Sequence, residues 1–408
     1  MLQAMLLILD MKMEEITQKE QIRKRPAEPK VKGSSLKRTI AGFFLLIYFC
    51  TVIWTGPPMI LFTSVIIQIK CFDEVINIAY RSKKMEELPH YKTLNWYFVI
   101  VANYFFFVDA FQPHIQVITR KYQMLDFLMN YHRFLAFCLY FLGLAFFLSF
   151  VNIKPIRKQF TLLAWTHCLL MIFSVQSYML LRSMFQGLIW PFMPFVLVIT
   201  NDVFSYMFGK LFGRTPLISL SPNKTLEGFI FGGIATFISA ILLSHCFCSV
   251  RYLICPLSYV ERNGLISIST NCTPTYFFQL QSYKVWNITF STYPFVFHAI
   301  AMSCFASMVA PFGGFCASGL KRAVKIKDFA DTIPGHGGLL DRFDCQFLTC
   351  TFINVYVSTF VKGVSVNRIY EKVLYMNDGN QIKFLQLLHA ELVQKGMLNK
   401  TLELPLIQ

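Results

Sequence analysis

The sequence predicts an all-α, polytopic membrane protein with about nine transmembrane helices. Hydrophobic residues make up 55% of the 408 residues and charged residues only 15%, and the mean hydropathy is +0.49. A soluble domain has about a quarter of its residues charged. The apolar residues gather in runs close to the roughly 20 residues that cross about 30 Å of hydrocarbon, rather than on one face of a helix. The chain is therefore expected to lie in a lipid bilayer.

The first two apolar segments are short and are joined by Thr55-Gly56-Pro57-Pro58, so they form either a tight helical hairpin or two tilted spans. Nine spans would place the C-terminus in the lumen, and eight would place it in the cytosol. The nine predicted spans are 40–55, 57–70, 93–111, 133–152, 159–181, 186–204, 227–246, 292–313 and 344–363.

Lysine and arginine gather beside particular spans of this chain, whose formal net charge is +16. With a cytosolic N-terminus, the basic loops 71–92, 153–158, 205–226 and 314–343 all fall on the cytosolic side, as the positive-inside rule requires. The charge thus indicates topology and contact with anionic headgroups. No zinc-finger or RNA-binding pattern accompanies it, so we expect no nucleic-acid partner.

Three regions follow from this arrangement. Residues 1–38 are expected to form a disordered, basic cytosolic tail, and residues 39–363 the polytopic transmembrane domain. Residues 364–408 form a C-terminal tail with an amphipathic pattern, which suits the membrane surface, a partner subunit or packing on the protein's own spans. The sequence leaves the oligomeric state, including a homodimer, open.

Loop 247–291 falls on the lumenal side and is poor in basic residues. Asn271 and Asn287 stand in glycosylation acceptor patterns there. In an oxidising compartment, one or two disulfides are expected among the four cysteines of this region. These are Cys246, Cys248, Cys255 and Cys272.

Two polar loops interrupt the apolar pattern, and two spans separate them, so they share one side of the membrane. The first runs from Asn201-Asp202 to Gly228. A carboxylate such as Asp202 costs about 2.5–3.5 kcal/mol at membrane depth, so it has either a task or a helix-capping role. Thr225 and Glu227 are equally well explained as the cap and first-turn acid of the following helix.

The second loop, residues 318–344, carries the denser set of charges. Lys321, Arg322 and Lys327 are of the types that bind phosphate. The turn Gly335-His336-Gly337-Gly338 brings backbone amides to the start of a helix, where they favour an anion. If this helix begins near Leu339, Asp341 and Asp344 lie three residues apart on one face, a spacing that suits Mg²⁺.

Four short patterns occur here in order: Ser318-x-Leu320-Lys321-Arg322, Lys327-Asp328, Pro334-Gly335-His336-Gly337-Gly338 and Asp341-Arg342-Phe343-Asp344. Over these 27 residues the chain resembles the eukaryotic phosphatidate cytidylyltransferases, or CDP-diacylglycerol synthases. The resemblance continues from about residue 40 to the C-terminus. It implies that the protein converts CTP and phosphatidic acid to CDP-diacylglycerol and pyrophosphate with Mg²⁺, as a step of phospholipid synthesis. It also implies that the protein lies in the endoplasmic reticulum membrane and that its site faces the cytosol.

The resemblance also implies roles for individual residues. Catalytic roles fall to Lys321, Asp328, Asp341 and Asp344, and the metal ligands are Asp341, Asp344 and, as a substitute, Asp202. The residues implied to bind substrate are Ser318, Arg322, Lys327, His336, Arg342, Lys224, Thr225, Glu227 and Asn201.

The chain departs from the family pattern at a few positions. Asn223 replaces a lysine and Leu226 a tryptophan in the Ser-Pro-Lys-Lys-Thr-Trp-Glu-Gly loop. Gly313-Gly314 stands where bacterial members have Gly-Asp, so Asp202 or Asp328 is expected to replace that carboxylate. Two alternatives stay open: a CTP-dependent lipid kinase of the dolichol type, and a non-catalytic membrane scaffold or transporter.

Overall fold

A computed structural model describes residues 33–82, 90–119, 122–218, 220–256, 258–262, 265–269, 272–286, 288–330, 332, 337–361, 369, 373–374 and 376–396. The chain divides into two compact units, Met1–Asn354 and Val355–Gln408. The second unit contains the π-helix Val357–Val361 and helix α15 (Asp378–Gln394), which buries none of its residues. The acceptor asparagines 271 and 287, and nearly all of the predicted N-terminal tail, lie outside the described residues.

The first unit is built of helices, as predicted. Its long helices are α2 (Gly33–Thr55), α3 (Pro57–Ser82), α4 (Tyr91–Thr119), α6 (His132–Ser149), α7 (Ile156–Met184), α8 (Ile189–Phe212), α9 (Leu226–Cys248), α11 (Phe295–Met308), α12 (Pro311–Ala323) and α13 (Leu340–Tyr356). Short helices α5 (Gln123–Asn130) and α10 (Arg251–Ile254) lie between them. Gly56 separates α2 from α3 with a φ of +82°, in agreement with the predicted break.

By length and composition, six helical segments of the described chain are able to cross a membrane. One of them joins α11 and α12 into a single apolar segment, Phe295–Ala323. The helices of the other three predicted spans are too short or too charged to count as membrane spans. The apolar part of α2 is only Gly42–Thr55, α3 carries charged residues, and α13 has 17 residues. The chain is thus a multi-pass membrane protein, whereas the number nine stays a prediction.

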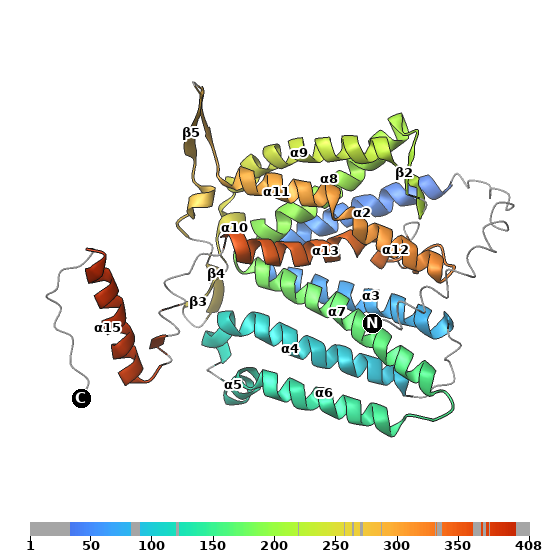
Figure 1. Cartoon of the computed structure of the whole chain (residues 1–408), viewed down its shortest axis with the longest axis horizontal. Helices are drawn as coiled ribbons and strands as arrows, with labels where there is room; N and C mark the ends of the chain where they lie inside the picture. Colours follow the sequence, from blue (N-terminus) through green and yellow to red (C-terminus); the bar gives the residue numbers. More distant parts are fainter. Residues whose placement is uncertain are drawn as a thin grey trace. The chain divides into compact units, whose positions relative to one another are not determined.

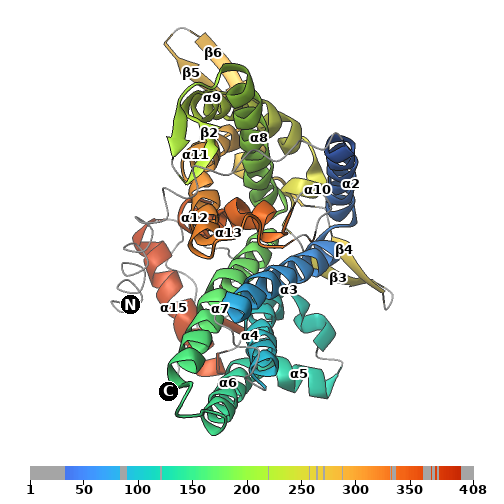
Figure 2. The ribbon, with the colours of Figure 1, turned by 90° about the vertical axis from the view of Figure 1, so that its right-hand side faces the viewer.

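The first unit arranges its helices in two groups with α12 and α13 between them (Figures 1 and 2). In one group α8 packs on α9, and both pack on α11. In the other, α4 packs on α6 and α7, and α3 packs on α7. Buried polar side chains link this second group, since Gln68 donates to Asn103 at 2.6 Å and to Ser174 at 2.8 Å. Such interhelical hydrogen bonds are typical of helices packed in a membrane.

In the described part of the chain, three small antiparallel hairpins interrupt the helices, and no sequence pattern predicted them. They pair β1 (Pro216–Ile218) with β2 (Ser221–Thr225), β3 (Ser258–Arg262) with β4 (Leu265–Ser269), and β5 (Gln281–Val285) with β6 (Ile288–Thr292). The short helix η1 (Tyr276–Phe278) precedes β5.

One disulfide joins the segments around these hairpins. It links Cys255 to Cys272, so one bridge of the expected one or two is confirmed. Cys246 and Cys248 are free thiols.

The contact between α8 and α9 depends on a glycine. A Cβ atom on Gly232 would lie 2.9 Å from both the Cα and the N of Ser205, so a side chain there would force the helices apart. We expect Gly232→Ala to lower the free energy of unfolding by about 1–3 kcal/mol. Thermal unfolding in detergent measures this.

The neighbouring residue provides a matched control for the Gly232 variant. A Cβ atom on Gly233 would lie no closer than 3.4 Å to Ser307, an ordinary contact. Gly233→Ala gains the same helix propensity and should unfold at or above the wild-type temperature. Equal unfolding temperatures for the two variants would contradict the close α8–α9 contact.

Candidate active site

The two polar loops meet in the structure. Lys224, in β2, places its Nζ 4.9 Å from the centroid of the Phe315 ring in α12. This contact confirms that the loops share a side, as the number of intervening spans predicts. It also brings the start of α9 to the helix that carries Ser318, Lys321 and Arg322.

Gly314 of α12 faces a carboxylate and a cation at van der Waals distance. A Cβ atom at this position would lie 3.4 Å from Asp344 Oδ2 and 3.6 Å from Lys224 Nζ. Asp344 lies in the second turn of α13, and its Oδ1 accepts a hydrogen bond from the Cys345 amide at 2.7 Å. The glycine that departs from the bacterial pattern therefore faces the polar groups of the site.

Asp202 of α8 belongs to the same cluster. Its carboxylate interacts electrostatically with Lys224, Asp344 and Arg342. Lys321 acts on Asp344 in the same way. Two carboxylates from two helices are thus balanced by cations, an arrangement that a mere boundary of basic residues would not produce. Whether Asp202 has a task in the reaction stays a prediction.

Lys321 and Asp341 form an ion pair that is largely shielded from solvent. Lys321 Nζ lies 2.6 Å from Asp341 Oδ1, and the two side chains are 16% and 6% exposed. Asp341 Oδ2 accepts hydrogen bonds from the amides of Phe329 and Gly338, both at 3.2 Å. Removing one partner of a buried pair typically destabilises a protein by about 3–5 kcal/mol. Asp341 therefore holds the loop between α12 and α13 in place.

Glu74 of α3 takes part in the site, although the sequence did not single it out. Its side chain is buried, and it accepts hydrogen bonds from the amides of Leu339 at 2.8 Å and Leu340 at 3.0 Å. The Thr332 hydroxyl donates to it as well. The sequence feature that could have indicated Glu74 is the acidic pair Asp73-Glu74 just after an apolar segment. Neither residue belongs to the patterns of the second loop, so nothing linked the pair to the site.

These hydrogen bonds correct one expectation about the glycine-rich turn. The amides of the turn Gly335–Gly338 were expected to face an anion at the start of the helix. Among these, the Gly338 amide instead donates to Asp341, and the next two amides, of Leu339 and Leu340, donate to Glu74. Helix α13 begins at Leu340, one residue after the predicted start. Although Asp341 and Asp344 lie one turn apart, their carboxylates have different partners.

The remaining predicted residues differ in their surroundings. Thr225 is the N-cap of α9 and accepts from the Gly228 amide, which confirms the capping alternative. Glu227 accepts from the amides of Arg214 and Thr215 and so ties the β1–β2 hairpin to α9. Asn201 is buried and accepts from Thr236 in the α8–α9 contact.

Six further predicted residues lie in or beside the second loop. Ser318 is half-buried in α12, and Arg322, Lys327 and Arg342 are exposed. Asp328 lies against Gly337, because a Cβ atom on that glycine would be 3.3 Å from Asp328 Cγ. His336 lies outside the described residues.

The donor set is compatible with Mg²⁺. Over the described residues, no three His, Cys, Asp or Glu side chains converge on one point. Mg²⁺, however, usually takes only one or two carboxylates and completes its octahedron with water and substrate phosphates. Asp344 and Asp202, which interact across the cluster, supply such a pair.

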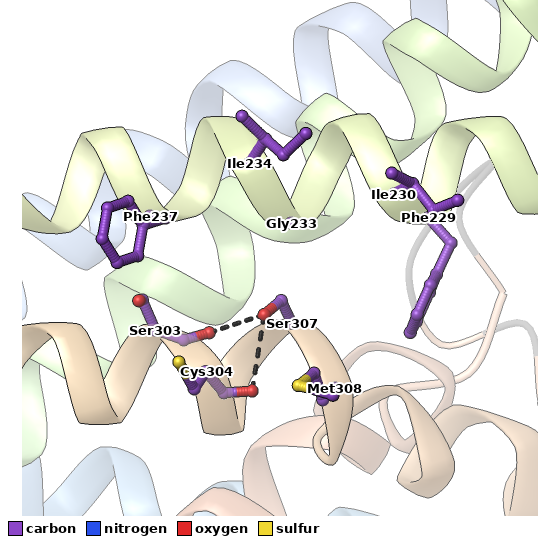
Figure 3. Close-up of a pocket in the computed structure, with 9 residues that line it drawn as sticks. All are labelled: Phe229, Ile230, Gly233, Ile234, Phe237, Ser303, Cys304, Ser307 and Met308. Atoms are coloured by element: carbon purple, nitrogen blue, oxygen red, sulfur yellow. Dashed lines mark hydrogen bonds between the residues drawn. The ribbon is translucent and has the colours of Figure 1, made fainter.

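An apolar groove of about 360 Å³ lies between α9 and α11 (Figure 3). Phe229, Ile230 and Ile234 line one wall, and Cys304 and Met308 line the other. The hydroxyls of Ser303 and Ser307 donate to carbonyls of their own helix. None of the predicted polar residues lines this groove, so it is distinct from the charged cluster.

The chain is similar to known proteins along most of its length. The cytidylyltransferase family matches residues 36–360. "Phosphatidate cytidylyltransferase 2" of Homo sapiens is 42% identical over 381 residues, which cover 91% of this chain and 84% of the relative. "Phosphatidate cytidylyltransferase 1" of Mus musculus is 41% identical over 381 residues, 91% of this chain and 81% of the relative.

A nematode relative shows the same extent of similarity. "Phosphatidate cytidylyltransferase" of Caenorhabditis elegans is 39% identical over 374 residues, 88% of this chain and 79% of the relative. The matched region contains both polar loops and every helix from α3 to α13. This protein belongs to the cytidylyltransferase family.

Proposed function

We propose that this protein is a phosphatidate cytidylyltransferase, which converts CTP and phosphatidic acid to CDP-diacylglycerol and pyrophosphate. Family membership and the names of the relatives support the activity. The observation that carries the proposal is that Lys224, from the first polar loop, and Asp344, from the second, meet at Gly314. Cations beside metal-binding carboxylates are what a reaction between two phosphates requires.

The reaction joins a phosphate oxygen of phosphatidate to the α-phosphorus of CTP. The bond between that phosphorus and the oxygen bridging to the β-phosphate breaks, and pyrophosphate leaves with the electron pair. The attacking phosphate is already ionised, so no general base is needed. Catalysis consists of alignment and of neutralising the charge that spreads over the phosphates. Lys224 is placed for this task, and Arg322 and Lys327 are exposed at the edge of the site.

We assign Asp344 and Asp202 as the residues that would hold Mg²⁺. When bound, the metal would neutralise phosphate charge and orient the triphosphate. Asp341 was predicted, together with Asp344, as a metal ligand. Its carboxylate already accepts from Lys321 and two amides, so we give it the role of placing Lys321 and the loop. Asp328 and Ser318 stay predicted contacts of the polar pocket.

We further propose that the protein lies in the endoplasmic reticulum membrane with the site facing the cytosol. The basic loops favour this orientation. The disulfide supports it independently, because disulfides persist in oxidising compartments. Helix α9 leads from Thr225 at the site towards the disulfide-linked segment, and its 23 residues span roughly 35 Å, enough to cross the bilayer.

A product assay separates the proposed activity from the kinase alternative. The purified protein, supplied with labelled CTP, phosphatidate and Mg²⁺, should form CDP-diacylglycerol and release pyrophosphate in equal amounts. A lipid kinase would release CDP and phosphorylate an alcohol instead. A scaffold or transporter would form neither product.

Asp344→Asn tests the metal assignment without breaking an ion pair in the structure. The amide keeps the shape of the side chain but loses its charge, so we expect turnover to fall by about 100-fold or more. The Mg²⁺ concentration for half-maximal activity should rise, and chelation should abolish wild-type turnover. Unchanged turnover and Mg²⁺ dependence in Asp344→Asn would refute this assignment.

A larger side chain at Gly314 should crowd the site. Gly314→Val would add two methyl groups where a Cβ atom already contacts Asp344, Cys345 and Lys224, and we expect at least about a tenfold loss of kcat/KM. Gly319→Val in the same helix is the control, since the nearest atom to a Cβ there is Leu220 Cδ1 at 3.8 Å. Steady-state kinetics and thermal unfolding of both variants check this expectation; equal losses in both would contradict it.

A further inference from the structure

Glu74 is distant in sequence from every residue of the second polar loop, yet it holds the start of α13. Its Oε1 accepts from the Leu339 amide and the Thr332 hydroxyl, and its Oε2 accepts from the Leu340 amide. The first amides of a helix have no partner within the helix, and they favour a negative charge. The Glu74 carboxylate of α3 therefore caps α13 by accepting from the Leu340 amide, the first amide of that helix.

Two carboxylates enclose the backbone at Gly338. A Cβ atom on Gly338 would lie 2.9 Å from Glu74 Oε2 and 3.1 Å from Asp341 Oδ2. The amide of Gly338 donates to Asp341, and the next two amides donate to Glu74. Three consecutive amides are thus divided between two acidic side chains, one from α13 itself and one from α3.

A chain of contacts leads from Glu74 to the charged cluster. Glu74 fixes the amides of residues 339 and 340, and the next residue, Asp341, pairs with Lys321. Asp344 follows one turn later in the same helix and lies against Gly314. Any shift of the first turn of α13 would therefore move the Lys321–Asp341 pair and Asp344 together.

We infer that Glu74 is a positioning residue, which acts on the reaction by holding the first turn of α13 and, through it, Asp344. This inference rests on the proposed function. Both of its oxygens are engaged by donors of the loop and of α13, and the neighbours given for Gly314 are other residues. Outer contacts of this kind typically change metal affinity or activity by about 10–100-fold.

Glu74→Gln tests the inference, because glutamine keeps the size of the side chain but turns one acceptor into a donor that faces the Leu339 or Leu340 amide. We expect kcat to fall by about 10–100-fold and the half-maximal Mg²⁺ concentration to rise, with a smaller change of KM for CTP. Glu74→Asp keeps the charge and should recover part of the loss. Asp73→Asn, at the neighbouring position of the same helix, should behave like the wild type.

A merely destabilising substitution provides the second control. In Gly143→Ala the new Cβ would lie 2.6 Å from Tyr97 Cε1, in the contact between α6 and α4. This variant should unfold at a lower temperature but keep the wild-type Mg²⁺ dependence. The inference fails if Glu74→Gln has wild-type kinetics, or if Gly143→Ala shifts the Mg²⁺ dependence equally.

Hydrogen exchange tests the contact without any assay of activity. The peptide that contains Leu339 and Leu340 should exchange faster in Glu74→Gln than in the wild type. In Asp73→Asn the same peptide should exchange at the wild-type rate. Unchanged exchange would overturn the role of Glu74. A wild-type protein that forms no CDP-diacylglycerol would overturn the proposed function, while faster exchange in Glu74→Gln would still support the contact.

Discussion

The backbone amides at the start of α13 are satisfied by two carboxylates, and the geometry of the site follows from this. Glu74 reaches them from α3, and Asp341 reaches back from the helix itself while it binds Lys321 of α12. Unpaired amides and charges are costly away from water. These contacts give hydrogen-bond partners both to the amides at the helix end and to the buried carboxylates, and they hold α3, α12 and α13 together at one point. The charged cluster around Asp344 lies one turn further along α13.

Around this point two glycines lie where other groups come close. Gly232 lets α9 lie against Ser205 of α8, and Gly314 faces Asp344 and Lys224. The β1–β2 hairpin, tied to α9 by Glu227, carries Lys224 towards α12. Helices α12 and α13 lie between the two helix groups (Figure 2), so each group contributes one acidic residue, Asp202 from α8 and Glu74 from α3.

Much of this could be predicted from local patterns. Runs of apolar residues indicate membrane helices, because each run is a local feature of the sequence. Counting these runs then places Lys224 on the same side of the membrane as Asp344. The partner of each carboxylate could not be predicted. Asp341 and Asp344 look equivalent by spacing, but only the packing directs one to Lys321 and the other to Gly314. Glu74 escaped notice because its partners are 265 and 266 positions away.

That separation has a consequence for the synthesis of the protein. At about 5–20 residues per second, the ribosome needs roughly 13–53 s to pass from Glu74 to Leu339. During this time α4 to α12 are made and inserted while the amides that bind Glu74 do not yet exist. The proposed site is consequently among the last parts to assemble. A transcript that ends before α13 would yield a chain that has most of its spans but lacks Asp344. Glu74 of this chain would lack the amides of residues 339 and 340.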